Sequence, residues 1–364
     1  MSSLLGARFL QQRLVRDLEQ HAPLRLGVAF SGGADSMALA HMAAAWADEA
    51  GGRSVVALHV NHNVRPESGD EQRRALGMLR RACPTPRLVI GEPLSVHWPN
   101  GVPPAPGHVQ KLCRTERYTL LDRACRRYHV DTLLAAHHLN DQAETLLMRI
   151  ARSTSLRGLA AMHTLTPLVD YGRPPHLLLW RPLLDVRKHD LVAYCRLHAL
   201  DWIHDPSNDK LEYRRVYARH LVQALESDFA CPLSAFADVA RAASVLDLAL
   251  EHAVDDFLRL VVPELDFDAP AASTAAALAP PADITQRRCS VDVRSFLALP
   301  APVAARVLQR FVPTTTNAHA ANFIRTTRNR YSAFLQGRKP TTSFPFTDLF
   351  SLYARLPTPR RRRS

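Results

Sequence analysis

The feature that most constrains the fold is the segment SGGADS at residues 31–36, which stands between two apolar runs. Residues 24–30 are predicted to form a buried parallel strand, and a helix is predicted to begin near Asp35. Small residues in such a turn let successive backbone N–H groups converge, and the helix adds the positive end of its dipole. The segment therefore predicts a phosphate-binding loop. The alternative is a plain glycine-rich turn in which Ser31 or Asp35 only caps the helix.

Short apolar runs alternate with helical patterns through the first half of the chain. The predicted strands are residues 24–30, 54–60, 87–90, 131–138 and 176–184. Strands that alternate with helices are typical of an α/β fold with a mostly parallel, doubly wound sheet. Prolines crowd residues 91–107, which predicts a surface loop there.

The strand pattern ends after residue 208, and the apolar spacing of residues 233–261 predicts a long helix. We therefore expect a catalytic domain over residues 1–220 and a helical C-terminal domain over residues 221–364. Alanine and proline dominate the start of residues 268–290, which predicts a flexible linker inside the second domain.

The composition restricts the partners. The chain has 46 basic and 34 acidic residues, a formal net charge of +12, and this favours a polyanion, with nucleic acid as the leading candidate. The arginines at residues 360–363 form a basic tail that is expected to add affinity for phosphate. No apolar run approaches the length of a membrane span, so no membrane partner is expected.

The cysteines and the N-terminal residues give information about the cellular compartment of the protein. The six cysteines include no CxxC pair, which argues against a disulfide framework or a zinc knuckle and favours an intracellular protein. Residues 1–16 carry three arginines and no acid, as in a mitochondrial presequence, but a helix leading into the first strand would read the same way. The sequence therefore leaves the cytoplasm and the mitochondrial matrix open.

The loop fits neither the GxxxxGK[ST] motif nor the dinucleotide motif GxGxxG. It resembles the pyrophosphate loop of the N-type ATP pyrophosphatases, which split ATP between the α and β phosphates and adenylate their substrate. This resemblance implies ATP as cofactor, bound by Ser31, Gly32, Gly33, Ala34, Asp35 and Ser36.

Further segments resemble, in the same order, the motifs of the tRNA(Ile)-lysidine synthetases. They include HVNHNVRPES at residues 59–68, CRTERY at 113–118 and AAHHLNDQAETLLMRIAR at 135–152. The resemblance implies a ligase that adenylates C2 of the wobble cytidine in tRNA(Ile) with a CAU anticodon. The ε-amine of lysine then displaces AMP to give lysidine. Two alternatives stay open: a tRNA thiolase of the same loop class, and a non-catalytic ATP- or tRNA-binding relative.

The matching motifs also supply candidate catalytic residues, namely Asp35, Arg65, Arg114, Arg117, His137, Asp141 and Glu144. Asp141 and Glu144 are candidates to hold Mg²⁺ or to take the proton from the ammonium group of lysine. The alternative for this pair is a capping box, with Asp141 at the N-cap and Glu144 at the third helical position.

Three basic residues toward the second domain are candidate tRNA contacts: Arg181, Lys188 and Arg219. Ordinary surface salt bridges are the alternative for them. Other positions depart from the family pattern, and each departure weakens a local site. These positions are Asn61, Lys111, Ser153, Ser155 and Val216. The departures are what keep the non-catalytic alternative open.

Overall fold

The computed structural model describes residues 6–18, 24–49, 52–98, 103, 106–152, 155–168, 177–204, 214–261, 296, 298–311 and 324–325. Two compact units divide the chain, and the main boundary between them falls after Arg241, inside the long helix α9 (Leu233–Val261). The predicted domain boundary near residue 220 stays a prediction. The predicted linker and the basic tail lie outside the described residues.

A six-stranded sheet with the strand order β4-β2-β1-β6-β8-β7 forms the centre of the first unit. Its strands are β1 (Arg25–Ala29), β2 (Ser54–Leu58), β4 (Leu88–Ile90), β6 (Thr132–Leu134), β7 (Leu165–Leu168) and β8 (Leu177–Trp180). All neighbouring strands are parallel except β7, which runs antiparallel to β8. The mostly parallel sheet is therefore confirmed, with a strand at each of the five predicted places. The edge strand β7 was not predicted.

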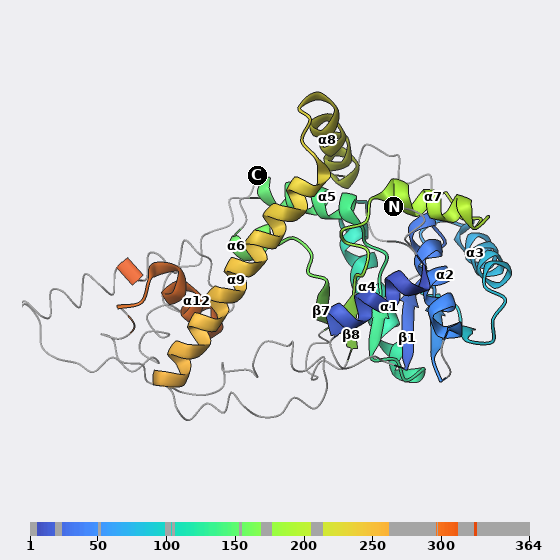
Figure 1. Cartoon of the computed structure of the whole chain (residues 1–364), viewed down its shortest axis with the longest axis horizontal. Helices are drawn as coiled ribbons and strands as arrows, with labels where there is room; N and C mark the ends of the chain where they lie inside the picture. The colour runs from blue at the N-terminus through green and yellow to red at the C-terminus, as the bar shows by residue number, and fades with distance from the viewer. Residues whose placement is uncertain are drawn as a thin grey trace, which may run out of the picture. The chain divides into compact units, whose positions relative to one another are not determined.

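Helices cover both faces of this sheet (Figure 1). The helices of the first unit are α1 (Ala7–Leu18), α2 (Ala34–Asp48), α3 (Ser68–Ala82), α4 (Pro106–Arg127), α5 (Leu139–Ile150), α7 (Lys188–Leu197) and α8 (Arg214–Asp228). The division between the two units falls within the short helix α6 (Leu156–Leu159). Residues of α1, α2, α3 and α7 share one core cluster, and residues of α4 share the other with the opposite side of the sheet. This is the doubly wound arrangement. The long helix α9 has the predicted bounds, and α12 (Ala301–Phe311) follows it.

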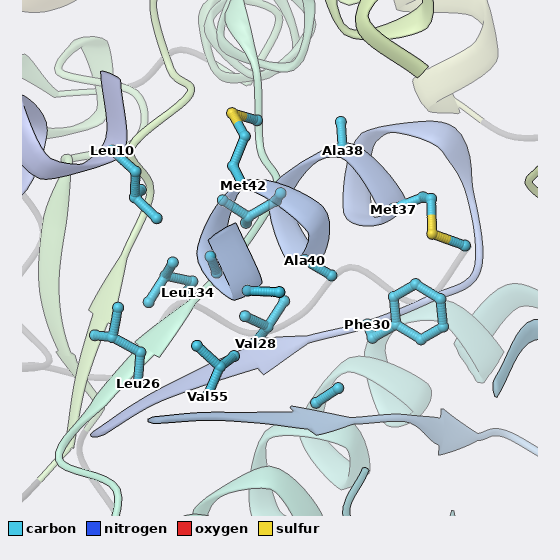
Figure 2. Close-up of a cluster of buried hydrophobic side chains, with 14 of the residues drawn as sticks. Leu10, Leu26, Val28, Phe30, Met37, Ala38, Ala40, Met42, Val55 and Leu134 are labelled. Atoms are coloured by element: carbon cyan, nitrogen blue, oxygen red, sulfur yellow. The ribbon is translucent and has the colours of Figure 1, made fainter. Parts of the chain in front are cut away.

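The strand β1 and the helix α2 are both anchored in the core, as Figure 2 shows. Leu26 and Val28 of β1 and Met37 and Met42 of α2 are fully buried in the same cluster. A central parallel strand is covered on both faces, which explains why its sequence is an almost continuous apolar run. Because both flanking elements are fixed, the loop between them is held in one place.

The N-terminal helix α1 is packed into the same core. Leu10 and Leu14 are buried there, and Trp180 Nε1 donates a hydrogen bond of 2.9 Å to Asp17 Oδ2. The helix expectation for this segment is confirmed, whereas the presequence reading finds no support. Among the helices of the described residues, none combines the length and the apolarity that a membrane span needs.

The proline-rich segment is more ordered at its start than predicted. A short strand β5 (Leu94–Ser95) pairs in parallel with β3 (Val60–Asn61), and Trp98 Nε1 donates to the carbonyl oxygen of His62 at 2.8 Å. The surface-loop prediction is therefore wrong for these residues. A two-residue strand has no periodicity of its own, so only its pairing with β3 reveals it.

Candidate functional site

The SGGADS loop is a tight turn from β1 into α2, and α2 begins at Ala34, one residue before the predicted start. Ser36 Oγ accepts from the Ser31 N–H at 3.2 Å and donates to the Gly33 carbonyl at 2.9 Å, which closes the turn. Gly33 is the N-cap and has no side-chain capping bond, so a pure capping role for Ser31 or Asp35 is not what the structure shows. Within the described part of the chain, no backbone acceptor takes the N–H groups of Gly32, Gly33 or Ala34. These donors stand at a helix N-terminus, where anions bind.

Gly32 is the loop position that requires glycine. Its φ is +86°, and a Cβ added there would lie 2.8 Å from the Cβ of Ala75. We expect Gly32→Ala to lower the free energy of unfolding by about 2 kcal/mol, because it combines a left-handed backbone with a close contact. Urea unfolding measures this loss. Gly33→Ala is the matched control, since an added Cβ there meets only Ser31 Oγ at 3.7 Å. Equal losses for the two variants would contradict the expectation.

Asp35 and Asp141 face the same histidine. His138 Nε2 lies 3.5 Å from Asp35 Oδ2 and 3.4 Å from Asp141 Oδ2. Burial opposes protonation of His138, but the charges of Asp141 and Asp35 outweigh it and raise the pKa of the ring above its ordinary value. His138 therefore joins the start of α5 to the phosphate loop. Asp35 Oδ1 is buried and has no hydrogen-bond partner among the described residues.

The predicted capping box exists, but three residues earlier than predicted. His138 is the N-cap of α5, and Asp141 is the third helical residue, whose carboxylate accepts from the His138 N–H at 3.0 Å. The Asp141 N–H in turn donates to His138 Nδ1 at 3.4 Å. The assignment of Asp141 as the N-cap and Glu144 as its partner is therefore wrong, because a histidine side chain takes the acceptor role here.

Glu144 belongs instead to an ion-pair network with α8, which lies against α5. Its Oε2 is 2.8 Å from Arg215 Nε, and its Oε1 is 2.9 Å from Arg219 Nε. Arg215 Nη2 also lies 2.6 Å from Asp141 Oδ1. Burial raises the pKa of Asp141, but the charges of His138 and Arg215 outweigh that effect and lower it to about 2. A continuous line of charged contacts thus runs from α8 through α5 to Asp35.

This network bears on the predicted metal ligands. Each carboxylate oxygen of Asp141 and Glu144 already has a guanidinium or backbone N–H partner. Within the described residues, no group of three or more histidine, cysteine, aspartate or glutamate side chains is arranged to hold a metal ion. In this structure the two carboxylates act as ion-pair partners, and their role as Mg²⁺ ligands stays a prediction.

His137 precedes His138 in the chain, and its ring is close enough to Asp141 for the charge of that carboxylate to act on it. Burial lowers the pKa of His137 to about 3, the charge of Asp141 opposes this effect, and the charges of Arg181, Arg215 and Arg117 add to it. The imidazole is therefore neutral at physiological pH. Its Nδ1 is buried without a hydrogen-bond partner among the described residues.

The predicted arginines occupy different surroundings. Arg114 and Arg117 flank the ring of Tyr118, each with its guanidinium carbon 5.0 Å from the ring centroid. The charge of Arg117 also reaches His137. Arg65 lies just before α3 and pairs with Glu71 at 2.9 Å.

The three predicted tRNA contacts are also placed differently from one another. Arg181 is only 5% exposed and donates to the carbonyl oxygen of His163 at 2.7 Å and to Thr166 Oγ1 at 2.9 Å. It is thus a buried residue and not the surface charge that the sequence suggested. Arg219 is held by Glu144, whereas Lys188 is exposed at the start of α7, where its charge acts on His138.

The sequence analysis did not predict two features of this site. These are the ion pairs of Arg215 with Asp141 and Glu144, and the position of His138 as the N-cap of α5. A usable signal for the first existed: Arg215 and Arg219 are four residues apart on α8, and Asp141 and Glu144 are three apart on α5. Residues at these spacings share one helix face, so the two pairs could have been matched by charge.

Comparisons with known proteins agree with this geometry. Residues 8–225 match the model of a family described as a PP-loop domain. The tRNA(Ile)-lysidine synthase of Bradyrhizobium sp. is 34% identical over 292 residues, which cover 79% of this chain and 73% of that protein. That of Ralstonia nicotianae is 35% identical over 237 residues, which cover 65% of this chain and 48% of that protein.

Length and fold add two further observations. The chain spans about half the length of several curated relatives that it matches. The solved structure of a U34-tRNA thiolase from Methanococcus maripaludis has a TM-score of 0.53 at 17% identity and covers 66% of this chain and 76% of its own, which shows a shared fold. From the residues matched and the relatives found, this chain belongs to the PP-loop domain family and, within it, to the tRNA(Ile)-lysidine synthases.

Proposed function

We propose that this chain uses ATP and lysine to convert the wobble cytidine of tRNA(Ile) with a CAU anticodon to lysidine. The observation that carries the proposal is the line of contacts from the phosphate loop to α8, through Asp35, His138, Asp141 and Arg215. This line joins the SGGADS loop to a set of paired charges, which supports a site for adenylation followed by attack of an amine. The bacterial relatives named tRNA(Ile)-lysidine synthase support the same reaction.

In this proposal the loop binds the phosphates of ATP. The N–H groups of Gly32 and Gly33, which have no backbone acceptor among the described residues, donate to them, and the N-terminus of α2 adds its dipole. A Mg²⁺ ion bound with ATP would neutralise the leaving pyrophosphate, and the unpartnered Oδ1 of Asp35 is a hard oxygen ligand of the kind that this ion takes. Asp35 thus fits the metal role better than Asp141 or Glu144.

The second half of the reaction needs a nucleophilic amine. The oxygen of C2 attacks the α-phosphate of ATP and pyrophosphate leaves. The ε-amine of lysine then attacks C2, a C–N bond forms, and the C–O bond breaks as AMP departs with its electron pair. We assign to Asp141, which is ionised, the attraction of the lysine ammonium, which gives its proton to water before the amine attacks. His137 is neutral, and its Nδ1, which has no partner among the described residues, accepts a hydrogen bond from the amine.

The remaining residues keep the roles predicted for them as part of this proposal. Arg65, Arg114 and Arg117 are proposed contacts to phosphate or to the adenylated base, and Lys188 and Arg219 are proposed contacts to tRNA. Residues 1–220 are the proposed catalytic domain and residues 221–364 the proposed tRNA-contacting domain. We place the reaction in the cytoplasm, because the relatives are bacterial proteins.

Pyrophosphate release tests the substrate. A wobble cytidine is already unpaired in the anticodon loop, so it can enter a protein site at little cost. We expect release to require tRNA with a CAU anticodon and to stop when the wobble cytidine is changed to uridine. A reaction that proceeds equally without tRNA would contradict the proposal, and incorporation of sulfur would favour the thiolase alternative.

A further inference from the structure

Two arginines lie over one tyrosine beside the proposed reaction site, and two more lie near this group. The guanidinium carbons of Arg114 and Arg117 are each 5.0 Å from the centroid of the Tyr118 ring. Arg181 is the third, and its charge acts on the Tyr118 hydroxyl. Arg149 of α5 is the fourth, and burial and the charge of Arg114 together lower its pKa. Arg149 and Arg181 also donate to the carbonyl oxygens of two neighbouring residues, Ala161 and His163, which brings these two arginines to the same segment of the chain.

No carboxylate balances these four charges in the described part of the chain. Arg149 donates instead to the carbonyl oxygens of Gly158 and Ala161, at 2.9 and 2.7 Å. Arg181 is likewise bound to uncharged acceptors, and its Nε is buried with no hydrogen-bond partner among the residues that the structure describes. A buried cation with an unused N–H group is costly to stability unless a ligand completes it. The cluster therefore has the character of an anion site.

The position of the cluster separates it from the phosphate loop. Arg181 directly follows β8, and β6 lies between β8 and β1, which leads into the loop. Two strand spacings amount to about 10 Å, so an anion at the cluster is not the phosphate chain held at Gly32 and Gly33. His137 follows β6, the strand between β8 and β1, and the charge of Arg181 lowers the pKa of its ring.

Two ligands of the proposed reaction have an anionic group that could reach this position. Lysine has one carboxylate but carries a net positive charge, so four unbalanced arginines repel the molecule as a whole. RNA carries a negative charge at every nucleotide, and arginines arranged around an aromatic ring suit its phosphates and bases. We infer that Arg114, which lies over the Tyr118 ring, binds together with Arg149 and Arg181 a backbone phosphate of the RNA next to the nucleotide being modified. This inference rests on the proposed function.

The salt dependence of RNA binding tests this site. The probe is an anticodon stem-loop RNA with the sequence CAU, titrated with the full chain between 50 and 200 mM salt. We expect Arg114→Met and Arg149→Met each to weaken binding about fivefold to tenfold and to reduce the slope of log affinity against log salt by about 0.7 to 0.9, the value for one lost phosphate contact. The KM for lysine should stay unchanged.

Arg123→Met is the matched control, because Arg123 is an exposed arginine on the same helix as Arg114 and the substitution removes the same charge. Arg149→Met removes the hydrogen bonds to the carbonyl oxygens of Gly158 and Ala161, so thermal unfolding is used to check that this variant is still folded. Arg114 is exposed and has no such bonds to lose among the described residues, so Arg114→Met remains informative if Arg149→Met unfolds.

The outcomes separate this inference from the proposed function. A slope in Arg114→Met equal to that of Arg123→Met would overturn the phosphate site while wild-type lysidine formation still supports the function. A raised KM for lysine with unchanged RNA affinity would assign the cluster to the lysine carboxylate instead. If the wild-type chain bound no RNA, the proposed function itself would fail.

Discussion

Replacing Asp35 with asparagine should lower the rate of pyrophosphate release about 1000-fold, an increase in activation free energy of about 4 kcal/mol. Asp35 is at the phosphate loop, its Oδ1 has no partner among the described residues, and its Oδ2 faces His138. The amide keeps the size of the side chain but removes its charge. The Mg²⁺ ion that would neutralise the leaving pyrophosphate then loses an anionic ligand. Assays of the pyrophosphate released at successive times measure this rate.

The same variant makes a second, spectroscopic prediction. Since Asp35 is one of two carboxylates that raise the pKa of His138, its neutralisation should lower that pKa, which NMR titration of the ring reports. Glu49→Gln, an exposed acid just after the same helix, is the control and should alter neither quantity. Near-normal turnover in Asp35→Asn would show that the loop does not bind the reacting phosphates.

Replacing Glu144 with glutamine should lower the free energy of unfolding by about 3 kcal/mol. Its carboxylate is 2% exposed and holds the Nε atoms of both Arg215 and Arg219. Breaking a buried pair typically costs 3–5 kcal/mol, and the low end applies here because the two arginines are about one-third exposed and regain some water. Denaturant unfolding by circular dichroism measures the loss.

A surface ion pair between Glu226 of α8 and Arg187, the N-cap of α7, provides the control for this experiment. Glu226 of α8 lies 3.5 Å from Arg187, and both are partly exposed, so Glu226→Gln should cost less than 1 kcal/mol. A double-mutant cycle of Glu144→Gln with Arg219→Met should also give a coupling of at least about 1 kcal/mol. If Glu144→Gln lowered the free energy of unfolding by no more than Glu226→Gln does, the buried ion pairs of Glu144 would not stabilise the site.

The sequence predicts the parts of this site that are local along the chain. The strand, turn and helix around Gly32 are specified by an apolar run, two glycines and a second apolar run within about 20 residues, and all three elements lie where expected. The parallel order of the sheet follows from the same alternation of strands and helices. Periodicity and turn chemistry are short-range properties, so one sequence suffices to read them.

The parts that the sequence did not predict depend on contacts between distant residues. Glu144 and Arg219 are 75 positions apart, and no local pattern of either residue names the other as its partner. The capping box was placed three residues late because the sequence alone does not tell where the chain leaves β6 and begins α5. The burial of Arg181 likewise depends on β7, an edge strand that was not recognised.

The most direct test of the account is the mass of the modified nucleoside. Purified chain is incubated with ATP, lysine and unmodified tRNA(Ile) with a CAU anticodon, and the nucleosides are separated and weighed by mass spectrometry. The account predicts that the wobble cytidine gains a lysyl group through a new C–N bond, and that omission of either ATP or lysine prevents it. A cytidine that stays unchanged in the complete reaction, or one that gains sulfur, would contradict the account.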